Sequence, residues 1–350
     1  MKIISVILTY NRKDLLSQCL EAVSRQSRPC DEIIVVDNAS TDDTEQMLRQ
    51  QSLRNLTVHR LSENIGASGG FNAGFRLAYQ SGADQVWMMD DDVIPADDAL
   101  EKLLNADELL AEKAIEPAFL LSTAYTEHGL VTNAPSIDQR PNRIAYENWP
   151  LTLEHGIAPV RRATFVSILV PRRTLATYGL PIASMFIWGE DTEYTLRVTE
   201  DAPGFVVGNS KVVHLRQENG AIDIMAERNP NRVKYHRHYV RNEVFVARKY
   251  YRPRRVVVSV LHQCKIAMKL FGRGDFNKAG IVLRGLLESG PFNPSTESVD
   301  APIANLGVTV DSYTPGRSSI AGWEPPEHVT LVDLCDYHFS RQTMGSVNLS

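Results

Sequence analysis

Short apolar runs alternate with helical apolar spacing over the first ninety residues. Ile3–Thr9 is apolar and largely β-branched, which is typical of a strand buried on both faces of a parallel sheet. Lys13–Gln26 has the spacing of an amphipathic helix. The alternation continues with strands at Glu32–Val36, Leu56–Leu61 and Gln85–Met89, a helix over Thr41–Gln51 that Ser40 or Thr41 would cap, and a helix ending at Tyr79. It predicts right-handed βαβ units and a mostly parallel sheet flanked by helices, an α/β fold.

Polar residues follow the carboxyl end of each predicted strand. They are Tyr10-Asn11, Asp37-Asn38, Glu63-Asn64 and Asp90–Asp92. Each group alone is typical of a turn. Four such groups at one edge of a parallel sheet indicate the crevice where open α/β sheets bind ligands.

The pattern changes after residue 115. Strands are expected at Ala118–Tyr125, Ala163–Val170, Gly204–Gly208 and Lys211–Leu215. Residues 232–288 have mainly helical spacing, and the chain becomes rich in Pro, Ser and Gly after Pro291. We therefore expect an α/β domain over 1–225, a basic and then apolar helical region over 226–290, and an irregular acidic C-terminal extension over 291–350, whose role the sequence leaves open.

Charge is distributed unevenly along the 350 residues. Residues 291–350 contain seven acidic and two basic residues, which accounts for the net charge of −5. That overall charge gives no support for nucleic-acid binding. Arg232–Arg255 contains nine Lys or Arg residues and one Glu. This stretch is either a solvated helix face or a surface for anionic lipid or a lipid-pyrophosphate acceptor.

The four cysteines are widely spaced and form no C-x-x-C pair, which fits a reducing compartment and no disulfide framework. We find neither a signal-peptide cleavage site nor an apolar run near the ~20 residues that span a bilayer. We expect a cytoplasmic protein, with peripheral contact at the inner face of the plasma membrane through Arg232–Arg255 as an open option.

Two carboxylate clusters carry the candidate chemistry. Asp90-Asp91-Asp92 follows a strand, where carboxylates can share a hard cation such as Mg²⁺ or Mn²⁺; the alternative is a solvated acidic turn. Glu190-Asp191 opens a helix, where a carboxylate could take a proton from a hydroxyl group; the alternative is acids that stabilise the helix dipole. His214 gains a ligand role only if it meets Asp92.

Asn64–Gly74 is glycine-rich and precedes a helix, which allows close approach of phosphate groups. It is neither the dinucleotide fingerprint nor a P-loop, since it lacks G-x-G-x-x-G and the Walker lysine. The sequence therefore lacks the main motifs that would indicate hydride transfer or P-loop nucleotide hydrolysis.

In this order, the motifs resemble the inverting glycosyltransferases of family 2, which have the Rossmann-like GT-A fold. The matching pieces are Ser5–Arg12, Ile34–Asp42, Asn64–Gly74, Asp90–Asp92, Trp188–Asp191 and His214. The stretch from Phe186 to Tyr194 is most similar to galactofuranosyl- and rhamnosyltransferase-like members. Glu190 departs from the Trp-Asp-Asp form of the galactofuranosyl relatives, keeping the charge but changing its reach.

The resemblance implies a role for each matching position. The donor nucleotide would be held by Thr9, Tyr10, Arg12, Asp37, Asn38, Asn64, Gly66 and Gly70, with Asp91 facing the donor sugar or ribose. Mn²⁺ or Mg²⁺ would be held by Asp90, Asp92 and His214. Asp191 would be the catalytic base beside Glu190, and Trp188 would contact the acceptor.

The implied reaction moves galactofuranose, rhamnose or another hexose from a UDP- or dTDP-activated donor to a saccharide hydroxyl, in cell-surface polysaccharide or lipid-linked glycan assembly. A single displacement would invert the anomeric centre. Two alternatives stay open. A sugar nucleotidyltransferase should carry a glycine-rich loop with Arg or Lys after the first strand. A non-catalytic nucleotide-sugar or glycan-binding module should tolerate loss of Asp191 and Asp92.

Overall fold

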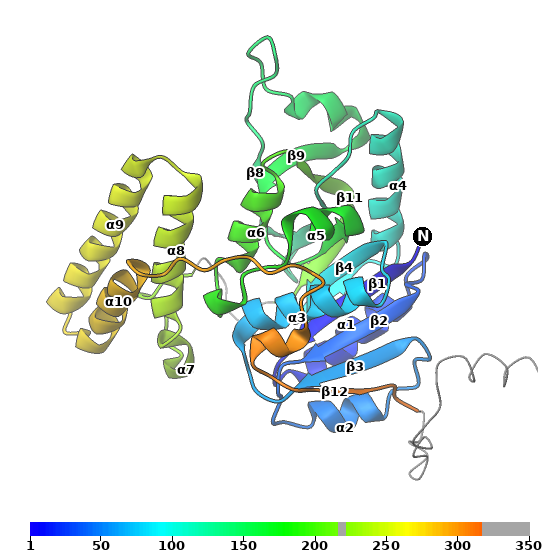
Figure 1. Ribbon diagram of the computed structural model, residues 1–350, viewed down its shortest axis with the longest axis horizontal. Helices are drawn as coiled ribbons and strands as arrows, with labels where there is room; N and C mark the ends of the chain where they lie inside the picture. Colours follow the sequence, from blue (N-terminus) through cyan, green and yellow to red (C-terminus); the bar gives the residue numbers. More distant parts are fainter. Residues whose placement is uncertain (216–221, 317–350) are drawn as a thin grey trace, which may run out of the picture. The chain divides into compact units, whose positions relative to one another are not determined.

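A sheet of 12 strands runs through the structure, a computed structural model that describes residues 1–215 and 222–316 (Figure 1). Its central path is β12-β3-β2-β1-β4-β10-β6-β11-β9-β8. The predicted α/β class, with helices flanking the sheet and a helical region after it, is confirmed. The described residues fall in one compact unit, Met1–Gly316, and the predicted boundaries at 225 and 290 stay predictions. Residues 317–350 of the predicted extension lie outside the described residues.

The first half of the sheet is parallel, as the alternation predicts. It contains β1 (Ile3–Thr9), β2 (Glu32–Asp37), β3 (Leu56–Leu61) and β4 (Gln85–Asp90), linked through α1 (Lys13–Ser24), α2 (Thr44–Arg49) and α3 (Gly66–Gln80). Every residue of β1 is buried, which explains its continuous apolar sequence. Helix α2 begins later than expected because the predicted cap, Ser40, accepts a hydrogen bond from the Asn11 backbone instead.

The second half of the sheet is mixed rather than parallel. Strand β10 (Ile168–Pro171) runs antiparallel between β4 and β6 (Leu120–Tyr125), and β11 (Gly204–His214) returns parallel to β6. The remaining strands are β5 (Val93–Pro95), β7 (Val131–Thr132), β8 (Ser136–Ile137) and β9 (Ile157–Arg162), all in antiparallel pairs. The expected strand at 163–170 begins only at Ile168, and the two expected strands after 204 are one strand with an irregular register.

Helices cover both faces of the sheet. Leu16 of α1, Leu48 of α2 and Leu103 of α4 (Ala99–Glu112) belong to one apolar core. Phe75 of α3, Leu175 of α5 (Arg172–Tyr178) and Tyr194 of α6 (Glu190–Val198) belong to the core on the other face. Short 3₁₀ turns, η1 (Trp149–His155) and η2 (Ala183–Met185), connect these elements.

The helical region contains α7 (Pro230–Val233), α8 (His236–Tyr250), α9 (Pro253–Gly272) and α10 (Phe276–Ser289). Helices α8, α9 and α10 pack against one another around Val240, Leu270 and Val282 (Figure 1). In the part of the chain that the structure describes, no helix is both long enough and apolar enough to cross a membrane.

Residues 291–316, the first part of the acidic extension, fold back on the preceding structure. The Arg248 guanidinium donates to the Phe292 carbonyl, and fully buried Arg76 of α3 donates to the Ala301 and Pro302 carbonyls and pairs with Glu297. After η3 (Ile303–Leu306), β12 (Val310–Tyr313) pairs antiparallel with β3. For these residues the extension is a packed strap.

Candidate functional site

The ends of three parallel strands bring the first group of expected residues together. Thr9 is paired with Asp37 across β1 and β2, and Leu8 is paired with Asp90 across β1 and β4. Thr9, Asp37 and Asp90 therefore share the carboxyl edge of the sheet, where the sequence places the crevice.

A buried polar network links that edge to the residues after β4. The Thr9 hydroxyl donates to Asp91 Oδ2 at 2.7 Å. Arg12 Nη1 donates to Asp91 Oδ1 at 3.1 Å and to Asp92 Oδ2 at 2.8 Å. Asp91 and Asp92 are nearly inaccessible, whereas the Arg12 side chain keeps 37% of its surface exposed. In this structure Arg12 is thus the counter-charge of the aspartates.

His214 meets Asp92, the condition that the sequence set for a ligand role. The β5–β11 pairing places His214 opposite Val93. Its Nε2 lies 3.2 Å from Asp92 Oδ1, and its Nδ1 lies 2.9 Å from Asn133 Oδ1. The second contact orients the imidazole ring.

The donor types in this group fit the implied metal, because carboxylates suit Mg²⁺ and Mn²⁺. However, within residues 1–215 and 222–316 no three His, Cys, Asp or Glu side chains are placed so that they could hold an ion together. Asp92 and His214 touch, and Asp90 stays apart from them. The side-chain types thus suit Mg²⁺ or Mn²⁺, but the described residues do not form a complete coordination shell.

Negative charge accumulates at this edge. Burial, followed by the charges of Asp92 and Asp91, raises the pKa of Asp90 well above its ordinary value, and Glu190 contributes to the same shift. Burial raises the pKa of Asp91 to about 6 against the opposing effect of Arg12. Despite burial, His214 and Arg12 hold the pKa of Asp92 below its ordinary value. A cationic ligand at this edge would be stabilised.

The expected nucleotide residues after β2 and β3 make mostly internal contacts. The Asn38 amide donates to the Gly66 carbonyl at 3.0 Å and accepts from the Ile65 backbone, while Asn64 Oδ1 accepts from the Gly66 backbone. A Cβ on Gly70 would lie 2.3 Å from a Leu8 methyl group, so this glycine lets α3 approach β1. Tyr10, by contrast, is 41% exposed.

The loop before α6 has an unusual backbone. Phe186, Trp188 and Gly189 all have positive φ angles, of 67°, 62° and 111°. Such angles cost energy for residues with side chains and persist only where the surroundings impose them. Gly66 lies so close that a Cβ there would stand 2.1 Å from the Phe186 carbonyl oxygen. We call residues 184–189 the base loop.

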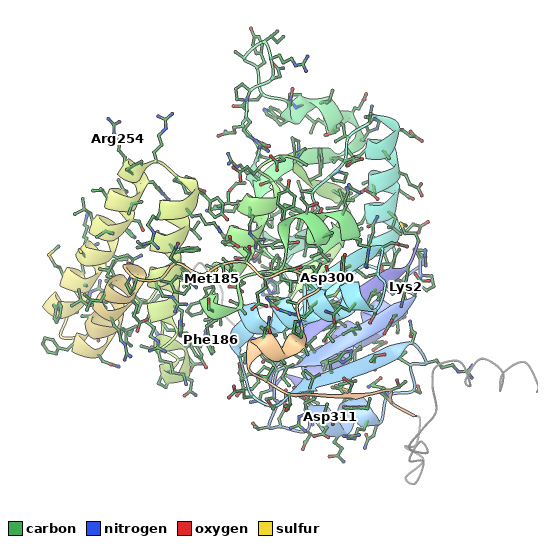
Figure 2. All side chains as sticks on the ribbon, viewed as in Figure 1. Lys2, Met185, Phe186, Arg254, Asp300 and Asp311 are labelled. Atoms are coloured by element: carbon green, nitrogen blue, oxygen red, sulfur yellow. The ribbon has the colours of Figure 1, made fainter. Side chains whose placement is uncertain are left out.

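One side chain of α8 holds the base loop in place. The amide nitrogen of fully buried Asn242 lies within hydrogen-bond distance of the Met185, Ile187 and Trp188 carbonyls, at 2.9, 3.2 and 2.8 Å. Neighbouring Arg241 donates to the Ser184 and Met185 carbonyls. The Ser68 backbone of α3 donates to the Phe186 carbonyl at 3.0 Å. Met185 and Phe186 of the base loop are labelled in Figure 2.

Glu190 and Asp191 follow the base loop directly, at the start of α6. Burial, and then the charge of Asp191, raises the pKa of Glu190 to about 8. Burial also raises the pKa of Asp191, although Asp191 Oδ1 accepts a hydrogen bond from the Thr192 backbone at 2.6 Å. Carboxyl groups with raised pKa values beside a strained loop are candidates for proton transfer.

Aromatic and basic side chains surround the outer side of the base loop. Trp188 lies 4.9 Å from His236, measured between ring centres, and 5.6 Å from the Arg232 guanidinium. A cavity of about 440 Å³ lies beside the loop. It is lined by Phe186, Lys234, Tyr235, Arg237, His238, Ile281 and Arg284. We call it the basic pocket.

Sequence reasoning missed the roles of Arg241, Asn242 and Glu193. It assigned the first two to a basic surface, whereas they hold the base loop. Glu193, which follows the candidate acids Glu190 and Asp191 on the same helix, is fully buried and bound by Arg197, Lys249 and Tyr250. Asparagine is a poor helix former, but its presence in the helix does not indicate from the sequence which groups it binds.

Comparison with known proteins finds similarity to glycosyltransferases over part of the chain. Residues 5–114 match the family model described as Glycosyl transferase family 2. The chain is 28% identical over 218 residues to galactofuranosyltransferase GlfT1 of Mycolicibacterium smegmatis, covering 57% of this chain and 66% of the relative. For GlfT1 of Mycobacterium tuberculosis the identity is 30% over 217 residues, covering 56% of this chain and 64% of the relative. The matches thus span just under two thirds of these relatives.

Solved structures are similar at lower identity. The S. aureus TarS 1–349 crystal structure has a TM-score of 0.48 and 15% identity, covering 84% of this chain and 93% of that one. GalNAc-T7 with UDP, GalNAc and Mn²⁺ has a TM-score of 0.48 and 13% identity, covering 70% and 50%. The sequence matches confirm the resemblance inferred from the motifs: residues 5–114 are similar to glycosyl transferase family 2, and the galactofuranosyltransferase relatives are similar over just over half of the chain.

Proposed function

We propose that this protein is a metal-dependent, inverting glycosyltransferase. It would move a hexose from a UDP- or dTDP-linked donor to a saccharide hydroxyl. The observation that supports the proposal is the buried polar network after β4, in which Thr9 and Arg12 bind Asp91 and His214 Nε2 lies 3.2 Å from Asp92 Oδ1. The galactofuranosyltransferase relatives favour galactofuranose over rhamnose as the transferred sugar.

In the proposed reaction, Asp191 accepts the proton of the acceptor hydroxyl as its oxygen attacks the anomeric carbon. The attack comes from the face opposite the leaving nucleotide, so the configuration inverts. Neighbouring Glu190, with its pKa near 8, is mostly protonated at neutral pH and leaves Asp191 as the basic carboxylate. The base loop fixes the direction of Asp191.

On the donor side, Asp37 would bind the base or ribose beside Arg60, whose Nε lies 3.6 Å from Asp37 Oδ2. Thr9 and Arg12 would hold Asp91 towards the donor sugar or ribose. Tyr10, Asn38, Asn64, Gly66 and Gly70 would shape the nucleotide pocket. Asp90, Asp92 and His214 would hold Mn²⁺ or Mg²⁺, which supplies positive charge for the departing diphosphate when bound.

On the acceptor side, Trp188 and the basic pocket would bind the saccharide and an attached phosphate or pyrophosphate. A lipid-linked acceptor in cell-surface glycan assembly fits this arrangement and a cytoplasmic location at the inner face of the plasma membrane. Membrane contact through Arg232–Arg255 would rest on the exposed Arg252, Arg254 and Arg255, because Arg241, Arg248 and Lys249 bind groups within the protein.

The test is calorimetric titration of UDP and dTDP into the protein with and without Mn²⁺, with NAD⁺ as the control nucleotide. We expect metal-dependent binding of UDP or dTDP and none of NAD⁺. Asp191→Asn should retain that binding and lose transfer from UDP-galactofuranose. Absence of diphosphate binding would refute the donor site, and normal transfer by the variant would point to a different base.

A further inference from the structure

The helical region exposes an unusual number of large apolar side chains. On α9 they are Val257, Val258, Leu261, Met268 and Phe271, with exposed fractions of 57, 55, 63, 66 and 43%. On α10 they are Phe276, Leu283 and Leu287, at 66, 38 and 79%. The Phe271 and Phe276 rings lie 6.0 Å apart and join the two helices. Contiguous exposed apolar side chains indicate an interaction surface.

The apolar residues of α9 lie on one stripe of the helix. Val257, Leu261, Met268 and Phe271 follow each other at helical spacing, with partly exposed Cys264 filling the gap. The helix packs against its neighbours with a different side, through buried Ser259, Gln263, Ala267 and Leu270. The stripe is therefore not needed to complete the described helical core.

Basic side chains border the stripe. Helix α9 contains Arg254, Arg255, Lys265 and Lys269 and no acidic residue, and all four basic side chains are exposed. Figure 2 shows Arg254 projecting from the end of α9. Arg252 and Arg273 add two exposed positive charges at its ends. The helix thus presents an apolar stripe and a positive rim side by side.

We infer that this face of α9 and α10 is a docking surface for an anionic lipid bilayer. An amphipathic helix binds such an interface by inserting its apolar stripe among the lipids while Lys and Arg contact the headgroups. A second copy of the chain is a poorer occupant, since a symmetric contact would bring two positive rims together. The inference deepens the proposed action on a lipid-linked acceptor.

The docking surface also adjoins the basic pocket. On α10, Arg284 lines the pocket, and its neighbours along the helix include the exposed Leu283 and Leu287. Phe186 of the base loop lines the same pocket. A bilayer at this face would hold the phosphate of a lipid-linked acceptor beside the base loop, which directly precedes Glu190 and Asp191.

The test is sedimentation of the full chain with vesicles of phosphatidylcholine alone or mixed with phosphatidylglycerol, at low and high salt. We expect binding to the anionic vesicles only, weakened by salt. Leu261→Asp and Met268→Asp should each reduce the bound fraction at least about tenfold. Ile144→Asp, at a side chain 74% exposed outside the helical region, is the matched control and should bind normally.

Three outcomes would overturn the inference. They are absence of binding to anionic vesicles, equal loss in the Ile144→Asp control, and a dimer in light scattering that Leu261→Asp converts to a monomer. The last would make the face an interface between two copies. Because vesicle binding needs neither donor nor transfer, its failure is distinguishable from failure of the proposed function, which nucleotide titration tests.

Discussion

Glu193 is the residue whose removal should most weaken the attachment of α8 to α6. Its carboxylate is inaccessible and accepts hydrogen bonds from Arg197, Lys249 and Tyr250 at 2.9, 2.9 and 2.5 Å. Glu193→Gln keeps the volume but leaves two positive charges without their counter-charge. Removing one partner of a buried ion pair costs about 3–5 kcal/mol. Lys249 is partly exposed, so its ammonium group can be solvated in the variant. We therefore expect the free energy of unfolding to fall by about 3 kcal/mol, the lower end of that range.

The assay is thermal unfolding at neutral pH, in which this loss lowers the melting temperature by about 4–5 °C. Glu21→Gln is the control, because Glu21 and Arg25 form the same i,i+4 pair on an exposed surface. The Glu21→Gln substitution should lower the free energy of unfolding by less than about 0.5 kcal/mol. If both variants lose equally little, the buried network does not hold α8, and the reasoning is wrong.

The pH dependence gives a second check on Glu193. Its neighbours, Arg197 first, hold its pKa below the ordinary value despite burial. A lowered pKa in the folded state stabilises the protein above the unfolded pKa of about 4.3 and loses that contribution as the pH falls through the folded value. The difference in stability between the unmodified protein and Glu193→Gln should therefore shrink only in acid.

Three further predictions concern the site and the strap. Asn242→Asp places a carboxylate against three carbonyls, so transfer should fall at least about tenfold while titration shows unchanged UDP affinity; equal activity would refute the positioning role. Glu190→Gln should raise the melting temperature, by an amount that grows from about pH 5 to 8, because a raised pKa makes the ionised native state costly; a pH-independent loss would contradict this. Arg76→Met should expose residues 297–302 to limited proteolysis, detected by mass spectrometry, and cost about 2–4 kcal/mol; unchanged protection would mean that the strap is held elsewhere.

The sequence predicts the parallel half of the fold and the edge that carries the site. Fully buried strands such as β1 are continuous apolar runs, so they can be predicted from a short stretch of sequence. The polar residues that follow them mark where the strands end. The antiparallel insertion of β10 between β4 and β6 is not visible in the pattern, because it depends on pairing with segments about fifty residues (β6) and about eighty residues (β4) earlier in the chain. Short antiparallel strands such as β8 and β9 are equally hard to predict.

The candidate site is predicted unevenly for a similar reason. Asp92 and His214 are each recognisable by residue type, but only the β5–β11 pairing brings them together. Arg12 is expected beside the nucleotide, and its hydrogen bonds to Asp91 and Asp92 become visible only in the folded chain. The contact between Asn242 and the base loop joins residues more than fifty positions apart, and no local pattern signals it.

The Asn242 amide, which binds three carbonyls of the base loop, limits how this chain can be divided. A fragment ending near residue 225 would contain every expected donor residue and both candidate catalytic carboxylates, Glu190 and Asp191, yet it would lack Asn242. Trp188, which has a positive φ angle, and its neighbours Met185 and Ile187 would then lose the hydrogen bonds that Asn242 donates to their carbonyls. Exchanging the first 225 residues between relatives would therefore transfer the expected donor-binding residues. The base loop before Asp191 would not be held in place unless α8 is exchanged with them.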